Sequence, residues 1–231
     1  MLNNDTRQIL KQLVTVNNQM IIADEMYGCN EFKSIYFKAE LNKLDKIGDT
    51  FGIYDASNFL SALDLLEDPA ISFDDKTKMI TATDANSTMS FLTSLVDSLE
   101  NVKINPKIIS STVAVPSVLE TALTPDIMNK IKKAQAVFKN FDTLWIDNTD
   151  RTTYLKLGTQ NSFSKSNNAF KIKLDTPVNQ QDFSIAIPLD SIMNIPVMDY
   201  TLRVKHNAEK DAYRVVVDNE LLTFILSLQK D

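Results

Sequence analysis

Apolar and polar residues alternate with two different periods along this chain, and each period predicts a different kind of element. In residues 5–18 and 125–140 the apolar residues recur every three or four positions, which predicts two amphipathic helices. Two shorter segments, residues 57–68 and 189–195, follow the same helical period. The pattern therefore predicts four helices, two long and two short.

Most of the other apolar residues alternate with polar ones or form β-branched runs, as in strands. Because strands outnumber the helices, we expect an α+β fold with helices packed on one face of antiparallel sheets. We expect the last strand, residues 222–228, to pair across a subunit edge, since an unpaired edge is a liability. The other main predicted strands are residues 36–41, 50–54, 78–83, 154–157, 169–174, 201–205 and 214–217.

This order of elements occurs twice in the sequence. Ile53 and Ile187 lie 134 positions apart, and so do Asp84 and Asp218. In each copy a strand-like segment leads into a short helix and then into alternating segments, and a longer amphipathic helix comes before. We therefore predict two divergent copies of one unit. The predicted domain boundaries are residues 1–98 for domain 1, 99–115 for an interdomain connector and 116–231 for domain 2.

Length and composition fit a soluble protein of two domains. A chain of 231 residues accommodates two domains of about 115 residues each, and its 44% of hydrophobic residues can form their cores. We expect no secretory leader and no membrane helix, because no apolar run approaches the roughly 20 residues that a membrane helix needs. The single cysteine, Cys29, fits a reducing cytoplasm and is expected to be buried.

The charges are unevenly distributed. The formal net charge is −6, yet residues 124–140 carry four lysines and one aspartate, a local +3, which leaves −9 for the rest. In the predicted helix 125–140, Thr124 is a suitable N-cap and Pro125 fits the first position. Its lysines are expected opposite an apolar stripe of Ile127, Ile131, Ala134, Phe138 and Phe141. A charged outer face is common on surface helices, but here the rest of the chain is acidic.

The predicted helix 5–18 repeats this design in the first copy. Ile9, Leu13 and Val16 form its apolar face, and at 100° per residue Arg7 and Lys11 are expected on the opposite side. The second helices carry no such cations. Cationic side chains this sparse suit loose contact with phosphates better than tight binding.

No group of residues typical of catalysis is present. Four glycines are too few and too scattered for a phosphate-binding loop. The only histidine, His206, lies in a polar segment that predicts a hairpin turn and a surface position. Asp74 and Asp75 are interpreted as a solvated turn rather than a metal pair. Asp55, Asp84 and Asp218 end strands, where capping is the simpler role.

One segment closely resembles the sliding clamps of T-even-type bacteriophages, which are processivity factors of the replicative DNA polymerase. It runs Ile-Tyr-Asp-Ala-Ser-Asn-Phe-Leu-Ser-Ala-Leu from Ile53, and is followed by Ala-Ile-Ser from Ala70 and Ile-Thr-Ala-Thr-Asp-Ala-Asn-Ser-Thr from Ile80. Residues 5–11 also resemble the amino-terminal helix of that family. The similarity is good over residues 1–92. Beyond them it depends on helix placement and on the duplication.

The resemblance implies a homotrimeric ring of two-domain subunits, closed head to tail, with helices lining the hole and sheets forming the outer wall. It implies no enzymatic activity and no cofactor. Duplex DNA, the replicative polymerase and a clamp loader are the implied partners, no membrane is involved, and the cytoplasm of the infected bacterium is the implied location. The residues expected to face DNA are Arg7, Lys11, Lys130, Lys132, Lys133 and Lys139.

The family binds short hydrophobic tails of its partners near the interdomain connector. Carried over to this chain, the resemblance assigns partner binding to Ile104, Ile108 and Ile109 in the connector and to Leu226 and Leu228 near the carboxy terminus. The mixed polarity of the connector predicts an extended segment, with a plain linker as the alternative. The connector matches the family poorly.

Two other functions stay open at the level of sequence. A monomeric polymerase accessory protein with the same duplicated fold binds DNA by direct electrostatics and normally needs a more basic face. A hydrolase or nuclease using paired aspartates would lose an intrinsic activity on mutation of a single Asp.

Overall fold

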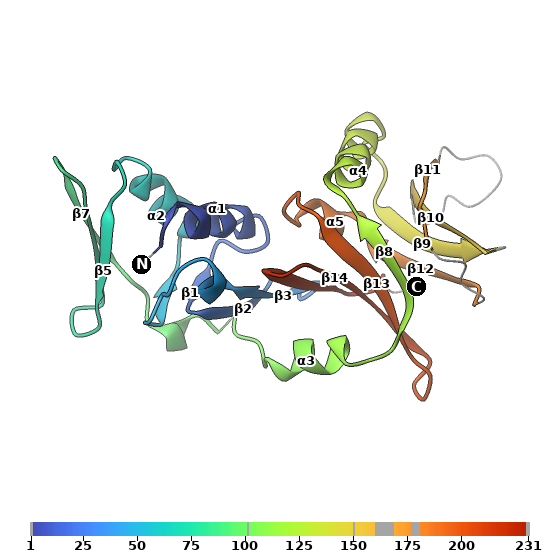
Figure 1. Ribbon diagram of the computed structural model, residues 1–231, viewed down its shortest axis with the longest axis horizontal. Helices are drawn as coiled ribbons and strands as arrows, with labels where there is room; N and C mark the ends of the chain where they lie inside the picture. Colours follow the sequence, from blue (N-terminus) through green and yellow to red (C-terminus); the bar gives the residue numbers. More distant parts are fainter. Residues whose placement is uncertain (1, 101, 150, 160–168, 177–180, 230–231) are drawn as a thin grey trace. The chain divides into compact units, whose positions relative to one another are not determined.

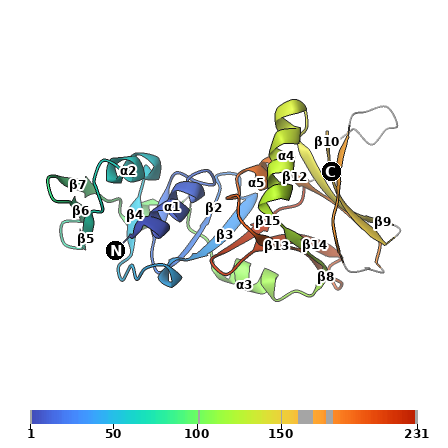
Figure 2. The ribbon, with the colours of Figure 1, turned by 45° about the horizontal axis from the view of Figure 1, so that its top comes forward.

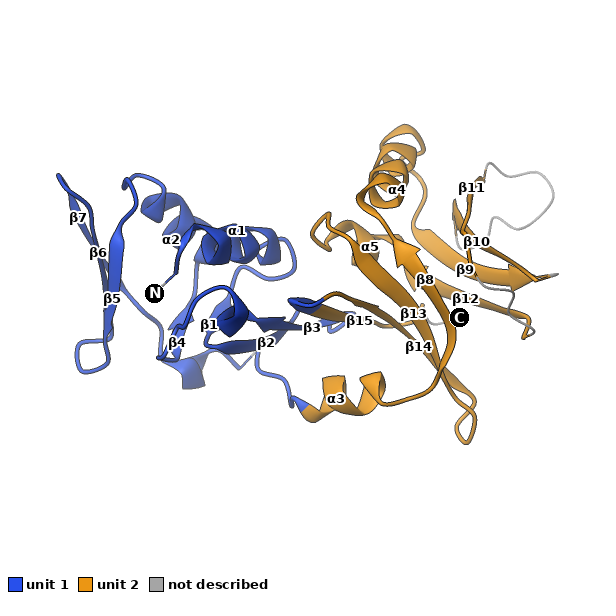
Figure 3. Ribbon diagram, in the orientation of Figure 1, with its two compact units in different colours: residues 1–106, 220–222 blue, residues 107–219, 223–231 orange. Residues whose placement is uncertain are grey.

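The computed structural model of the protein describes residues 2–100, 102–149, 151–159, 169–176 and 181–229. The chain forms two compact units (Figure 3). Unit 1 contains residues 1–106 and 220–222, and unit 2 contains residues 107–219 and 223–231.

Unit 1 consists of two helices and antiparallel strands (Figure 1). Strand β1 pairs with β4, β2 pairs with β3, and a three-stranded sheet has the order β5-β6-β7. Helices α1 and α2 contact each other and lie side by side in both views (Figures 1 and 2). The elements are α1 (Asn4–Leu13), β1 (Met20–Ile22), β2 (Glu25–Cys29), β3 (Ile35–Glu40), β4 (Phe51–Ile53), α2 (Ala56–Leu63), β5 (Ala70–Asp74), β6 (Met79–Thr83) and β7 (Thr88–Leu92), with 3₁₀ turns η1 (Leu41–Lys43) and η2 (Val96–Ser98).

Unit 2 repeats the plan. Its strands form a sheet of order β11-β10-β9-β12 and a second antiparallel series, β8-β13-β14-β15. Helices α4 and α5 lie on one side of the second series, and α3 lies on the other (Figures 1 and 2). The elements are α3 (Lys107–Val113), β8 (Ser117–Leu123), α4 (Pro125–Val137), β9 (Thr143–Thr149), β10 (Thr152–Gly158), β11 (Phe170–Lys173), β12 (Phe183–Pro188), α5 (Leu189–Met193), β13 (Tyr200–Asn207), β14 (Ala212–Asp218) and β15 (Leu222–Leu226).

The predicted duplication is visible in the topology. Among the described residues, each copy has one α-helix, four strands, a second α-helix and three strands, counted from α1 in unit 1 and from α4 in unit 2. Ile53 of β4 pairs with Met20 of β1, and Ile187 of β12 pairs with Leu144 of β9, so corresponding strands have corresponding partners. The predicted α+β class, with helices on antiparallel sheets, is confirmed.

Helix starts follow from local capping. The side chains of Asn3, Asp55 and Thr124 each accept a hydrogen bond from the backbone N–H three residues later, at the first turns of α1, α2 and α4. Burial then fixes each helix on its sheet. In unit 1, Phe59 of α2 is fully buried and contacts Phe91 of β7, with 4.9 Å between ring centroids.

Several expected boundaries are wrong. Helix α1 ends at Leu13 rather than residue 18, and α4 ends at Val137 rather than residue 140. The connector, expected to be extended, contains the seven-residue helix α3. Strands β1, β2, β8 and β9 were not predicted, because β1 spans only three residues and the others lack a strong apolar alternation. Among the described residues, no helix is long and apolar enough to span a membrane.

Candidate nucleic-acid and partner-binding surfaces

Helix α4 presents a cationic surface, which we call the α4 lysine face and define as Lys130, Lys132 and Lys133. The opposite side of the helix is buried through Met128, Ile131 and Ala134. The buried side is close to the predicted one, although Met128 takes the place of Ile127, which is only half-buried. Lys139 is exposed but lies just after the helix ends.

Most of these lysines have no acidic partner. Lys130 is paired with Asp126 one helical turn earlier, with 2.9 Å between Nζ and Oδ2. In the described part of the chain, no ion pair within 4.0 Å involves Lys132, Lys133 or Lys139. Their ammonium groups are therefore available to an external anion.

Helix α1 differs from this pattern. Arg7 is only 8% exposed, so the expectation that it lies on the solvent side of the helix is wrong. Its Nε atom is buried and has no hydrogen-bond partner among the described residues. Because α1 packs against α2 as well as the strands, a wider arc is buried than the apolar stripe indicated, including Thr6 and Leu10.

Lys11 is on the accessible side of α1 but is already paired. Its Nζ lies 2.7 Å from Oδ2 of Asp64, the C-cap residue of α2. The ion pair is partly exposed, so its contribution to stability is small. It nevertheless neutralises the one accessible cation of α1.

The three predicted partner-binding residues of the connector differ in how far their side chains are exposed. Ile108 is 39% exposed and Ile104 is half-buried, whereas Ile109 is only 3% exposed and packs inward. Successive residues of a helix are rotated by about 100°, so adjacent Ile108 and Ile109 of α3 point in different directions and only Ile109 packs inward. Val113, at the end of α3, is a further exposed apolar residue.

The two carboxy-terminal candidates also differ. Leu226 is fully buried in β15, which pairs with β14, so the expectation that it is exposed to a partner is wrong. Leu228 is half-buried beyond the end of this strand. Strand β15 has hydrogen-bonded strand neighbours on both of its edges within the chain, so the expectation that it pairs across a subunit edge is wrong.

Unit 2 contains a pocket that the sequence did not indicate, which we call the connector pocket. Its volume is about 310 Å³. The end of α3 and the segment after it form one wall, and the β13–β14 hairpin forms the other. The lining residues are Ser111, Thr112, Val115, Lys205, Asn207, Lys210, Ala212 and Arg214. A weak signal was present in β13, where Arg203, Lys205 and Asn207 recur every second residue.

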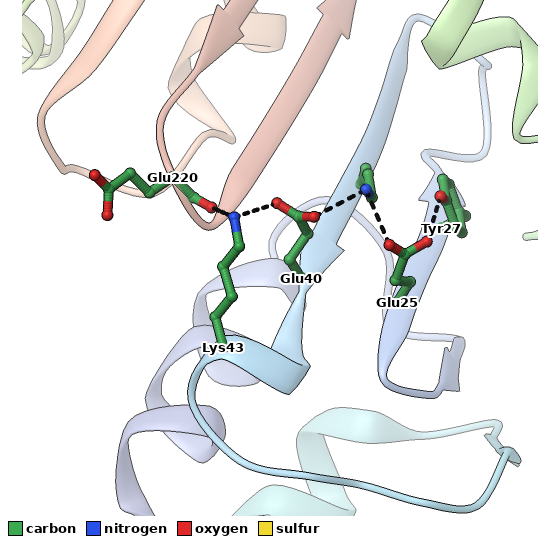
Figure 4. A network of polar contacts seen from close by, with 6 residues as sticks. Glu25, Tyr27, Glu40, Lys43 and Glu220 are labelled. Carbon is green, nitrogen blue, oxygen red and sulfur yellow. Dashed lines mark hydrogen bonds and ion pairs between the residues drawn. The ribbon is translucent and has the colours of Figure 1, made fainter.

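Unit 1 holds a network of charged groups (Figure 4). Lys38 pairs with Glu25 and Glu40, and Lys43 pairs with Glu40 and donates to the backbone oxygen of Glu220 at 2.6 Å. The hydrogen bond from Lys43 and the pairing with Lys38 hold the pKa of Glu40 below its ordinary value, although burial acts in the opposite direction. The network ties the short segment 220–222 to β3, where Glu40 N also donates to Leu221 O at 2.9 Å.

The structure forms no catalytic group from the candidate acidic and histidine residues. The described residues include no cluster of three or more His, Cys, Asp or Glu that could hold a metal ion. Asp74 accepts hydrogen bonds from Lys76 N and Thr77 Oγ1, and Asp75 pairs with Lys78, as in a solvated turn. His206 stacks on Tyr213, with its Nε2 atom 3.1 Å from Asp211.

Several solved structures superpose on this arrangement of helices and strands. Over 97% of this chain, the structure superposes on 94% of proliferating cellular nuclear antigen from Entamoeba histolytica, with a TM-score of 0.68 and 14% identity. The chain has the DNA-clamp fold. A second clamp-fold structure, the A. fulgidus antigen bound by the C-terminal region of FEN-1, matches 97% of this chain and 95% of that one, with a TM-score of 0.65 and 7% identity.

The DNA-clamp fold also includes longer chains. The Helicobacter pylori beta clamp bound to a DNA ligase peptide matches 99% of this chain, which spans 65% of that protein, with a TM-score of 0.58 and 13% identity. No family model and no curated protein matches the sequence. At these identities the similarities establish the clamp fold, and function has to be argued from the residues.

Proposed function

We propose that this protein is a DNA sliding clamp that encircles duplex DNA without reading its sequence and tethers the replicative polymerase for processive synthesis. The observation that carries the proposal is the duplicated clamp fold, which matches known clamps over 97% of the chain. On the α4 lysine face, Lys132 and Lys133 have no acidic partner among the described residues, whereas Lys130 is paired with Asp126. Two of the solved clamps carry bound segments of DNA-processing proteins, FEN-1 and DNA ligase, and partner tethering is proposed here by analogy.

The electrostatics support loose contact with DNA. Lys132, Lys133 and Lys139 can each approach a phosphate, and such contacts carry no base information. A few contacts of this kind weaken strongly with salt and allow sliding. Topological closure, rather than affinity, then keeps the protein on DNA. We assign a lesser part to Lys130 and Lys11, which are paired, and no direct contact to buried Arg7.

Three copies are proposed to close the ring head to tail. The units differ in charge: unit 1 has 9 Lys and Arg against 17 Asp and Glu, a net −8, whereas unit 2 has 15 against 13, a net +2. A contact between unlike ends is therefore electrostatically favoured over one between like ends. Among the described strands, β5 and β7 in unit 1 and β11 in unit 2 are sheet edges that could take part in such contacts.

The proposed partners are the polymerase and a clamp loader. Ile104 and Ile108 of the connector are accessible enough to receive an apolar tail, as is Leu228 in part. The proposal assigns no catalytic step, cofactor or membrane. By the resemblance of its first 92 residues, the protein is assigned to a T-even-type phage and to the cytoplasm of its bacterial host.

Light scattering over a concentration series tests the ring. A species near three times 26.0 kDa supports it. A monomer at every concentration favours either the accessory-protein alternative or a ring that assembles only during loading.

A retention experiment separates these last two. After loading, a clamp should stay on closed circular DNA and leave when the circle is linearised, because only a ring is held by topology. Equal retention on circular and linear DNA would contradict the proposal and favour direct electrostatic binding.

A further inference from the structure

The connector pocket is unusually cationic for the surface of an acidic protein. Lys205, Lys210 and Arg214 line it, and no Asp or Glu does. Lys205 and Arg214 are register partners on β13 and β14, so their side chains leave the same face of the hairpin. Three positive groups therefore surround a cavity of about 310 Å³, near the lower limit of ligand-binding sites.

One of these cations is held in place by the connector itself. Lys205 is only 7% exposed, and its Nζ donates to the backbone oxygen of Val113 at 3.0 Å. An ammonium group has three donors, and this hydrogen bond uses one of them. Lys205 is therefore a positioned donor in the lining of the pocket rather than an exposed surface lysine.

Three acidic residues near the pocket contact other side chains of unit 2. Arg203 pairs with Glu120 and Asp218, and Asp211 contacts His206. In the described part of the chain, no ion pair within 4.0 Å involves Lys205, Lys210 or Arg214. Buried Lys205 lies near enough to Glu120 and Asp218 that its charge acts to lower the pKa of both carboxyl groups. Lys210 and Arg214 are exposed, and an incoming carboxylate would meet a favourable field from these two cations.

We propose that the connector pocket binds side-chain carboxylates of a partner peptide that also carries apolar residues. The proposal rests on the tethering function above and specifies the chemistry of the tethered tail. Exposed Ile108 and Val113 lie on α3, whose end forms the pocket wall, so apolar and acidic residues of one peptide can be bound together. Charge-assisted hydrogen bonds to lysine and arginine supply the specificity for carboxylate.

A peptide fits this surface better than a nucleic acid. Val115, Ala212 and the hydroxyls and amide of Ser111, Thr112 and Asn207 give the pocket a mixed lining suited to side chains. A phosphodiester chain makes no use of Ile108 or Val113. Helix α4, which carries the lysines that we assign to DNA, and helix α3, whose end lines the pocket, lie on opposite sides of the β8-β13-β14-β15 series (Figures 1 and 2).

Fluorescence anisotropy with two synthetic peptides tests the proposal on the full chain. Both peptides have blocked termini and an aromatic-aliphatic pair. One carries two adjacent Asp residues and the other carries Asn in their place. The Asp peptide is expected to bind about tenfold more tightly at low salt, as for partly exposed charge pairs in combination. The difference should shrink as salt is added.

A double variant, Lys210→Glu with Arg214→Glu, should abolish this preference and leave binding of the Asn peptide nearly unchanged. Both side chains are exposed, so the fold should be retained, and the unfolding transition of Trp145 checks this. Lys46→Glu with Lys76→Glu, two exposed positions in unit 1, makes the same change in net charge and should keep the preference.

Equal binding of the two peptides, binding of neither, or displacement of the Asp peptide by single-stranded oligothymidylate would overturn the assignment. None of these results depends on ring closure. An Asp preference together with equal retention on circular and linear DNA would leave the pocket assignment intact and remove the sliding-clamp proposal.

Discussion

Helices α1 and α4 begin the two copies of the same unit, yet they use their cations in opposite ways. In α1, Arg7 is buried and Lys11 is paired with Asp64 across to α2. In α4, Lys132 and Lys133 have no acidic partner among the described residues. The duplication has therefore kept the positions of the helices while the role of their charges has diverged.

The net charges of the two units differ in the same way as the available cations of α1 and α4, with unit 2 the more positive. Unit 1 has a net charge of −8 and unit 2 of +2, which places the cationic surfaces of interest in unit 2. A fold depends on the buried side of each helix, whereas the outer side is constrained mainly by what it binds. The position of a lysine within the repeated unit is therefore a poor guide to whether it is available to a ligand.

The buried sides of α1 and α4 should contribute equally to stability. Truncation of one buried residue in each helix tests this and has the largest expected effect. Leu10→Ala in α1 and Ile131→Ala in α4 each remove a side chain that is at most 1% exposed. Each substitution should lower the free energy of unfolding by about 3 kcal/mol, because it removes apolar packing and leaves a cavity.

Urea unfolding can assign each loss to its unit. The single tryptophan, Trp145, lies on β9 in unit 2, so its fluorescence should report the Ile131→Ala change more directly. Lys133→Ala, at an exposed position of α4, is the control and should change stability by less than about 0.5 kcal/mol. A small effect at Ile131 would contradict the equivalence.

The outer sides of α1 and α4 should differ in their contribution to DNA contact, and charge reversal on α4 tests this. Lys132→Glu with Lys133→Glu should reduce loading onto circular DNA and processive synthesis about tenfold, equivalent to about 1.4 kcal/mol. The reason is that two attractive interactions with phosphate become repulsive. The salt dependence of DNA binding should also become shallower, by about 0.9 in logarithmic slope for each phosphate that a lysine no longer neutralises.

Lys11→Gln in α1 and Lys133→Gln in α4 are the matched variants, since each removes one positive charge. Lys11→Gln should have the smaller effect on loading and processive synthesis, because Lys11 is already neutralised by Asp64. Full processivity of the α4 double variant would show that the α4 lysine face does not contact DNA. An equal reduction for Lys11→Gln would contradict the divergence between the helices.

Loss of the N-cap of α4 should have an intermediate effect on stability. The Thr124 hydroxyl accepts a hydrogen bond from Ile127 N at 3.4 Å. Thr124→Ala should lower the free energy of unfolding by about 1 kcal/mol, because a helix-terminal N–H loses its partner. Thr124→Ser keeps the hydroxyl and should recover most of this stability. Thermal unfolding of the three proteins provides the comparison.

The smallest expected effect is on the pH dependence of stability. One carboxyl group in each unit has a shifted pKa, and the two shifts have opposite signs. The folded-state pKa of Glu40 in unit 1 is lowered from 4.5, so its contribution to stability is present above pH 4.5 and is lost as the pH falls through the lowered value. Asp218 in unit 2 behaves oppositely. Burial raises its pKa above 3.8, partly offset by Arg203, so its charged form is disfavoured in the folded state.

Glu40→Gln should therefore reduce the loss of stability between about pH 6 and about pH 3.5 by about 0.5 kcal/mol. Urea unfolding followed by circular dichroism at the two pH values measures the difference. An unchanged pH dependence would show that the network in Figure 4 does not stabilise the charged form of Glu40.

Several elements of the fold followed from local sequence. Thr124 and Pro125 mark the start of α4 because capping and a fixed φ act within one turn. The spacing between Ile53 and Ile187 indicated the repeat, since both copies place an apolar strand before a helix. The lysine-bearing outer side of α4 followed from helical period alone.

Other features required proximity between distant segments. Arg7 is buried because α2 and the strands cover more of α1 than its apolar stripe predicts. The connector pocket brings Val115 beside Arg214 across nearly a hundred residues. No short-range pattern indicates such an arrangement, because it depends on how α3 returns over the hairpin.

The sequence by itself determined the repeated helix and strand plan, the helix starts and the uneven distribution of charge, because these depend on neighbouring residues and simple periods. The tertiary structure decided which cations are buried, paired or available, and which polar residues surround a pocket. Those properties depend on packing and Coulomb interactions between segments far apart in the chain, and a side chain's period along one element does not encode them.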